Sequence, residues 1–242
     1  MFLSQSIKRA FRACGVSIDR FHPYRHEMLA IQRACERARV ELILDIGAND
    51  GGFVRELSET GILVDFLSVE PTSAAHEKLA NWAGRNPRWH VAPPVCIGSK
   101  QGEAKINIAA NSVSSSILPI AQRSVEANKE TAYIGTETVE MISIDRLVKN
   151  YHSLTAGKNL MLKIDTQGFE RDVLDGISSS MNRIKVIYLE LSLTEVYEGS
   201  PFADELIKYI RNLSYDCIGL FPGFTNTSSY EMLQVNGLFI RK

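Results

Sequence analysis

The sequence has few cysteines and no long apolar run. Its four cysteines lie far apart and form no CxxC pair, so neither a zinc site nor a disulfide framework is indicated. No stretch of the 242 residues approaches the apolar length that a transmembrane helix needs. The first ten residues are amphipathic, whereas a secretory signal has a continuous apolar core followed by a cleavage site of small residues. We therefore expect a reduced, cytoplasmic protein.

The sequence also lacks internal repeats, low-complexity tracts and a strong net charge. Its content of 45% apolar and 23% charged residues is typical of a globular chain, and 242 residues suit one sizeable domain. The net charge of −1 is uneven, because residues 1–40 hold eight Lys/Arg against three acidic residues and the remainder carries −6. This basic segment could be a solvated helix pair, or could face an anionic substrate, a membrane surface or nucleic acid. We expect no nucleic-acid partner, and peripheral membrane contact through the first helix stays open.

Apolar runs alternate with segments of helical spacing along the chain. The apolar runs predict strands at 42–45, 64–69, 90–97, 105–109, 138–144, 160–165, 186–190, 215–221 and 237–241. Helical spacing predicts helices at 2–13, 26–39, 53–60, 73–82, 170–174 and 201–213. This alternation favours a Rossmann-like α/β fold, with a mostly parallel sheet covered by helices on both faces. The last two strands are joined without a helix, which predicts an antiparallel final strand.

A glycine-rich turn follows the first of these strands. The turn reads DIGANDGG at residues 45–52, and its glycines would let the backbone approach a ligand at the start of the next helix. Dinucleotide enzymes and phosphate-binding proteins use similar turns, and many such turns bind nothing. Glu70 ends the second strand, where a carboxylate can accept hydrogen bonds from both ribose hydroxyls of an adenosine cofactor. The alternative is a helix-capping acid before Pro71.

A second group of charged residues lies in a strand that should be buried. Lys163 and Asp165 are two positions apart in the run LMLKID, so they share one face of the strand. Charges in a central strand are costly unless they are paired or used, which leaves a structural ion pair as the alternative. Glu190 ends the following strand. Four acids would thus line the edge where open α/β sheets bind ligands, namely Asp45, Glu70, Asp165 and Glu190.

These pieces resemble the FkbM family of methyltransferases, a branch of the class I enzymes that depend on S-adenosylmethionine. The matching segments are, in order, LILDIGANDGGF, FLSVEP, NSVSSSIL, VEMISIDRL, LMLKIDTQGFERDVLDGI, VIYLELS and NGLFIRK. They cover residues 40–242, so we expect a methyltransferase domain there and a helical extension at 1–39. The resemblance implies a seven-stranded sheet with an antiparallel last strand.

The resemblance also implies S-adenosylmethionine as cofactor and a site for it. Gly47, Asn49 and Gly51 would approach its methionine part, Glu70 its ribose and residues 96–98 its adenine, with Asp165 near the methyl group. The full set of implied contacts is Asp45, Gly47, Asn49, Gly51, Glu70, Pro71, Cys96, Ile97, Gly98 and Asp165. Residues 1–39 lie outside the resemblance and inherit no role from it.

A methyltransferase must mainly align its acceptor with the electrophilic methyl group and remove the acceptor's proton. We expect Asp165, or Glu190 with Lys163 as its orienting partner, to receive that proton, ahead of Glu170 and the histidines. The acidic cluster could instead hold Mg²⁺, but no tight metal-binding spacing supports a metal.

The acceptor is expected to be a small molecule or glycan with a free hydroxyl. The polar loop at 111–116 suits a hydroxylated ligand, and its candidate contacts are Asn111, Ser115 and Ser116, although a plain flexible loop would look the same. The resemblance implies methyl transfer to a hydroxyl, and together with this polar loop it favours an O-methyltransferase that acts on a sugar of a glycan, glycolipid or lipo-oligosaccharide, for example a fucose or another deoxysugar. A polyketide or peptide acceptor is the alternative within this class, and a non-catalytic adenosine-nucleotide-binding domain is the alternative outside it.

Overall fold

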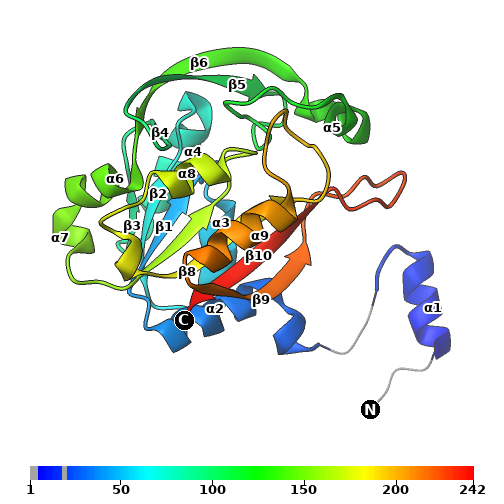
Figure 1. The fold of residues 1–242 in the computed structure, drawn as a ribbon. Coiled ribbons are helices and arrows are strands. Elements are labelled where there is room, and N and C mark those ends of the chain that lie inside the picture. Colours follow the sequence, from blue (N-terminus) through cyan, green and yellow to red (C-terminus); the bar gives the residue numbers. More distant parts are fainter. Residues whose placement is uncertain (1–4, 18–20) are drawn as a thin grey trace.

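The centre of the molecule is a seven-stranded β-sheet in a computed structural model that describes residues 5–17 and 21–242 (Figure 1). Its strand order is β3-β2-β1-β7-β8-β10-β9, and β10 is antiparallel to both of its neighbours. The predicted α/β class and the antiparallel last strand are confirmed. The strands are β1 (Leu42–Ile46), β2 (Asp65–Val69), β3 (Trp89–Val91), β7 (Leu160–Ile164), β8 (Ile184–Ser192), β9 (Tyr215–Pro222) and β10 (Gln234–Arg241).

Helices cover both faces of this sheet because alternate residues of each strand point to opposite sides. Leu42 and Leu44 of β1 pack toward one helical layer, and Ile43 between them packs toward the other. The first layer holds α6 (Ile144–Asn150), α7 (His152–Thr155), α8 (Glu170–Asp175) and α9 (Ala203–Asn212). The second holds α2 (Glu27–Ala38), α3 (Gly52–Ser58) and α4 (Ser73–Ala83). The central strands are therefore buried on both faces, as their continuous apolar runs predict.

The single strand expected at 90–97 is wrong, because this segment forms two strands in two different sheets. It is interrupted at Pro93 and Pro94, which have no N–H to donate to a sheet. β3 stays in the large sheet beside β2, whereas β4 (Val95–Ile97) joins a three-stranded sheet in the order β4-β6-β5. β5 (Gly102–Ala109) and β6 (Tyr133–Ile142) pair antiparallel there, where we expected further members of the parallel sheet.

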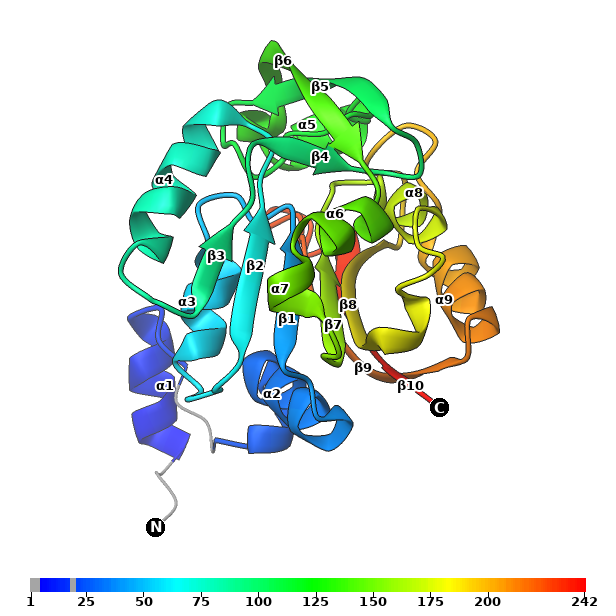
Figure 2. The same cartoon turned by 90° about the vertical axis from the view of Figure 1, so that its left-hand side faces the viewer.

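The three-stranded sheet lies across the carboxyl-terminal edge of the large sheet (Figure 2). Strand β6 ends at Ile142, two residues short of the predicted end, because Ser143 begins α6. The Ser143 hydroxyl accepts a hydrogen bond from the Arg146 N–H at 3.2 Å, which is a helix N-cap. Helices α5 (Gln122–Ala127), α6 and α7 had no counterpart in the sequence-based prediction.

The amino-terminal segment contains α1 (Gln5–Ala13), the 3-10 turn η1 (Pro23–Arg25) and α2. The helix predicted at 2–13 begins with Phe2 and Leu3, which lie outside the described residues. Helix α2 contributes Met28, Ile31 and Cys35 to the core, so it packs as part of the domain. Within the described ranges, no helix is both long enough and apolar enough to cross a membrane.

Candidate active site

The turn after β1 is shaped by backbone conformations that favour glycine. Gly47 and Gly51 have φ values of +74° and +87°, and Asn49 between them has +47°. A Cβ on Gly47 would lie 1.9 Å from the carbonyl oxygen of Asp165, so only glycine lets β1 and β7 approach this closely. The turn therefore brings its backbone against the carboxyl end of β7.

Gly47→Ala is expected to lower the free energy of unfolding by about 2–4 kcal/mol, because it adds both left-handed strain and a backbone clash. Gly61→Ala is the matched control, since Gly61 has φ +80° but nothing within 4 Å of the position that a Cβ would occupy. That control should cost only about 1 kcal/mol. Urea unfolding of both variants measures the difference, and equal losses would contradict the close approach at Gly47.

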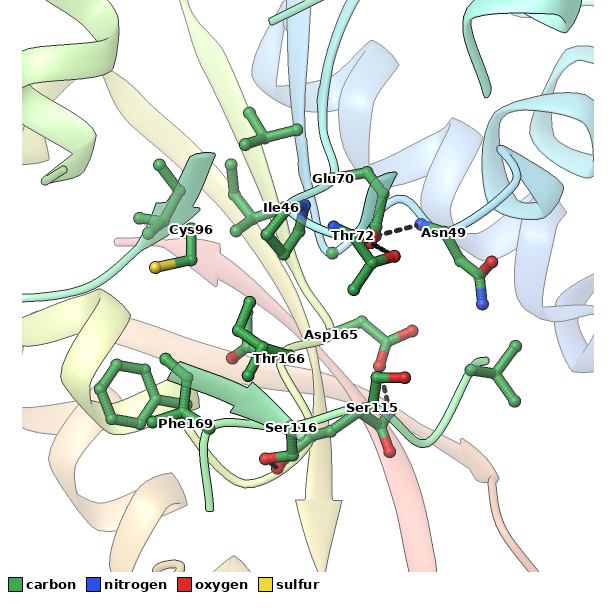
Figure 3. A pocket seen from close by; sticks show the side chains of 18 of the residues that line it. Ile46, Asn49, Glu70, Thr72, Cys96, Ser115, Ser116, Asp165, Thr166 and Phe169 are labelled. Atoms are coloured by element: carbon green, nitrogen blue, oxygen red, sulfur yellow. Dashed lines mark hydrogen bonds between the residues drawn. The ribbon is translucent and has the colours of Figure 1, made fainter. Parts of the chain in front are cut away.

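Glu70 follows β2 and is tied to the glycine turn (Figure 3). Its carboxylate accepts hydrogen bonds from the Asn49 N–H at 2.9 Å, and from the N–H and hydroxyl of Thr72 at 2.9 and 2.5 Å. Burial raises the pKa of Glu70, and the hydrogen bonds from Thr72 and Asn49 oppose this shift. The side chain is thus held in one position beside the turn, with accepting capacity left because a carboxylate has about four lone-pair sites.

A cavity lies between this carboxylate and the three-stranded sheet, and residues of both line it. One wall is apolar and includes Ile46, Val95 and Ile97, while Asp165 and Thr166 lie on another side. An apolar wall beside a fixed carboxylate fits an adenosine group, whose flat base is apolar and whose ribose hydroxyls donate hydrogen bonds. The residues of this cavity therefore fit the expected cofactor.

The expected cofactor contacts divide into two groups. Seven of them line the cavity, namely Gly47, Asn49, Glu70, Pro71, Cys96, Ile97 and Asp165. Asp45, Gly51 and Gly98 do not line it. A Cβ added to Gly51 would lie 2.5 Å from the ring of Trp89, and a Cβ added to Gly98 would lie 2.7 Å from the sulfur of Met141. These two glycines permit close packing against the two side chains.

Asp45 and Lys163 form a buried pair across β1 and β7, where they are register partners. The Lys163 ammonium lies 3.0 Å from Asp45 Oδ1 and 3.5 Å from Asp165 Oδ2, and donates to the Gly47 carbonyl at 2.7 Å. Burial lowers the pKa of Lys163, but the charges of Asp45 and Asp165 outweigh it and raise the pKa above its ordinary value. The lysine therefore stays charged and fixes the turn against Asp165. Within the described chain, no hydrogen bond or ion pair joins it to Glu190, the partner expected for it.

Asp165 and Glu190 are connected through the amide of Gln167. The Gln167 Nε2 group donates to Asp165 Oδ1 at 2.5 Å and to Glu190 Oε2 at 3.3 Å. The Tyr197 hydroxyl donates to Gln167 Oε1 at 2.5 Å, and Gln234 donates to Glu190 Oε2 at 2.8 Å. Burial raises the pKa of Glu190 well above its ordinary range, and the negative charges of Asp165 and Glu170 raise it further. The structure thus brings the two expected base candidates into one network.

Glu170 has a structural position instead of facing a cavity. Its Oε1 accepts hydrogen bonds from the Thr166 N–H and hydroxyl at 3.0 and 3.3 Å, and from the Gly168 N–H at 3.2 Å. Burial raises the pKa of Glu170 to about 7. The side chain therefore holds the loop that follows β7.

The three expected acceptor contacts divide between two cavities. Ser115 and Ser116 line the cofactor cavity, where Ser115 Oγ accepts from the Ala109 N–H at 3.0 Å and Ser116 Oγ donates to the Gln167 carbonyl at 2.6 Å. Asn111 lines a second cavity. The two cavities share Val113, Asp165 and Gln167, so they meet beside the carboxylate network.

Several residues of the site carried no specific signal in the sequence. Gln167 stood beside Asp165 in the resembling segment, but nothing in the pattern indicated that its amide bridges two carboxylates. Tyr197 and Gln234 come from the loop after β8 and from β10, far from the other motifs. Across the described ranges, no cluster of three or more His, Cys, Asp or Glu side chains is arranged to hold a metal ion.

The strand order, the glycine turn after β1 and the fixed acid after β2 define a Rossmann-like, class I methyltransferase that uses S-adenosylmethionine. The family model described as "Methyltransferase FkbM domain" matches residues 45–217. The chain therefore belongs to the FkbM methyltransferase family, and S-adenosylmethionine is its cofactor.

Three solved methyltransferase structures match this chain with little sequence identity. The methyltransferase domain of bacterial CtHen1-C has 8% identity and a TM-score of 0.46, covering 91% of this chain and 99% of that chain. An S-adenosylmethionine-dependent methyltransferase from Clostridium acetobutylicum ATCC 824 has 9% identity and a TM-score of 0.45, and the match covers 98% of this chain and 96% of that chain. Magnesium protoporphyrin IX methyltransferase from Synechocystis PCC 6803, with bound SAM, has 8% identity and a TM-score of 0.46, and the match covers 99% of this chain and 92% of that chain. No curated protein matches the sequence.

Proposed function

We propose that this methyltransferase transfers the methyl group to a hydroxyl oxygen of a sugar in a glycan, glycolipid or lipo-oligosaccharide. The observation that supports this acceptor is the second cavity, which meets the cofactor cavity at Asp165. Its polar side chains other than Asp165 and Glu190 are neutral amides and hydroxyls, namely Asn111, Ser114, Ser124, Asn128, Thr131, Gln167, Tyr197 and Gln234. Such groups pair with hydroxyls that both donate and accept.

In this proposal the cofactor lies in the first cavity, where Glu70 would hold the ribose hydroxyls and Cys96 and Ile97 would contact the adenine. When bound, S-adenosylmethionine supplies an electrophilic methyl group on a positively charged sulfur. The acceptor oxygen would then form a bond to the methyl carbon while the electron pair of the carbon–sulfur bond stays with sulfur, and the hydroxyl proton would pass to a carboxylate of the protein.

Glu190 is the base that this geometry favours, with Asp165 beside it. A carboxylate with a raised pKa is the stronger base once it is ionised, and Glu190 lines the second cavity. Gln167 and Gln234 donate to its Oε2 and so fix its orientation toward the cavity. Lys163 would hold Asp165 in place beside both cavities, because its ammonium group forms an ion pair with Asp165 and donates a hydrogen bond to the Gly47 carbonyl.

The pH dependence of kcat/KM is expected to follow the ionisation of Glu190. Only the ionised carboxylate accepts a proton, so activity should rise with pH through the raised pKa of Glu190 and be lost below it. Asp165→Asn removes one of the negative charges that raise this pKa, so the acidic limb should move to lower pH. Rate profiles of both proteins across the acidic and neutral range measure the shift. An unmoved limb, or one that moves to higher pH, would contradict Glu190 as the base.

The acceptor class is tested by incubating the protein with S-adenosylmethionine and a panel of methyl glycosides, with methyl α-L-fucoside included. Mass spectrometry should detect products that carry one added methyl group. A parallel panel of phenols and peptides serves as the comparison, because these represent the other acceptors that the fold could serve. Transfer to phenols or peptides without any transfer to glycosides would overturn the proposal.

A further inference from the structure

Gln234 has a special position in the second cavity. It is the first residue of β10 and pairs in register with Ser192 of β8, and only 3% of it is exposed. Its Nε2 group donates to Glu190 Oε2 at 2.8 Å and to Ser192 Oγ at 3.4 Å. The ionised form of Glu190, which is the form that can act as a base, only accepts hydrogen bonds, so the amide turns its nitrogen toward it. The orientation of the amide is therefore set by the carboxylate.

The oxygen of the same amide has no donor within the described parts of the chain. This oxygen is not completely enclosed by protein atoms, and Gln234 lines the second cavity, so a ligand in that cavity can reach it. The other amide oxygens that line the cavity are already paired. They belong to Asn111, Asn128 and Gln167, which accept from the Ser114 N–H, the Glu130 N–H and the Tyr197 hydroxyl.

A nearly buried amide oxygen that faces a cavity calls for a donor from the ligand, because leaving it unpaired in a bound complex is costly. This oxygen and the nitrogen that binds Glu190 share one carbon atom. The oxygen therefore lies no more than about 5 Å from the carboxylate that it accompanies. Two hydroxyl groups on neighbouring carbons of one ring can reach both groups at once.

We propose that the acceptor is a vicinal diol: one hydroxyl is methylated beside Glu190, and the neighbouring hydroxyl donates to Gln234 Oε1. This inference rests on the proposed function and adds a selection rule to it. Gln234 is then the residue that determines specificity, because a ring without the second hydroxyl leaves the amide oxygen unpaired. The alternative is that Gln234 only holds Glu190 in place.

A double-mutant cycle separates these two roles, with methyl α-L-fucoside and its monodeoxy analogues as acceptors. In the wild-type protein, kcat/KM should fall about 10- to 100-fold for the analogue that lacks the neighbour of the methylated hydroxyl. Methionine is similar in size to glutamine but has no amide. The Gln234→Met protein should therefore have a lower kcat/KM for the fucoside than the wild-type protein, and similar kcat/KM values for the fucoside and the deoxy analogue. Gln234→Leu repeats the test if the methionine variant does not fold, and thermal melting with S-adenosylmethionine binding checks both variants.

Ser192→Ala is the matched control. It removes the other partner of the Gln234 nitrogen and leaves the amide oxygen in place, so discrimination between the two acceptors should persist. Full discrimination in Gln234→Met, or equal wild-type rates on the fucoside and every deoxy analogue, would overturn the diol proposal and leave sugar methylation intact. Transfer to none of the glycosides would overturn both proposals together.

Discussion

Glu70→Ala is expected to weaken S-adenosylmethionine binding about 10- to 100-fold, because a hydrogen bond from a ribose hydroxyl to a charged acceptor is lost. The side chain is held at the cavity wall by Asn49 and Thr72, so in the wild-type protein little ordering is required on binding. Calorimetric titration with S-adenosylmethionine measures the change in Kd. NAD serves as the second ligand, and it should not bind to either protein.

Asp50→Asn is the control for Glu70→Ala, since Asp50 belongs to the same turn but bonds to Gly52 and Arg55 at the protein surface. Its Kd should stay within about twofold of the wild-type value. Thermal melting separates lost binding from lost structure, because Glu70 also secures the turn. A folded Glu70→Ala protein with an unchanged Kd would remove Glu70 from the cofactor site.

The second large effect is expected for Glu190→Gln, which should reduce kcat about 100- to 10,000-fold while the Kd for S-adenosylmethionine changes little. The variant keeps the size of the side chain but cannot receive a proton. It also lies outside the cofactor cavity, lining the second cavity instead, so cofactor affinity is the internal check. Single-turnover methyl transfer at mildly alkaline pH, with a glycoside acceptor, measures the chemical step.

Glu170→Gln is the matched control for this experiment, because it changes a second buried carboxyl in the same network of charges. All three hydrogen bonds to Glu170 are accepted by Oε1, and glutamine keeps one such oxygen. Its kcat under the same conditions should therefore stay close to the wild-type value. If Glu170→Gln fell as far as Glu190→Gln, the loss would reflect disturbed charge in the loop and not a missing base.

The class of fold and the cofactor were predictable from the sequence because their signals are local. Apolar runs such as LILDI and LMLKI are long enough to identify buried strands, and the DIGANDGG turn is one continuous segment. Glu70 was identifiable for the same reason, since it follows the very next strand. The division of residues 90–97 between two sheets was not predictable from the sequence. Each of the two strands has an ordinary apolar pattern, and the strands with which they pair are separate segments of the sequence.

The sequence by itself determined the alternation of strands and helices, the glycine turn and the acids that end the strands. Only the tertiary structure decided which of these acids face each other and which side chains accompany them. Gln167 joins Asp165 to Glu190, and Gln234 reaches Glu190 from a strand that begins 44 residues later. Such contacts depend on the register of β8 against β10 and on loops folded over the sheet edge. Strand register is a property of the whole sheet, so no local pattern of residues encodes it.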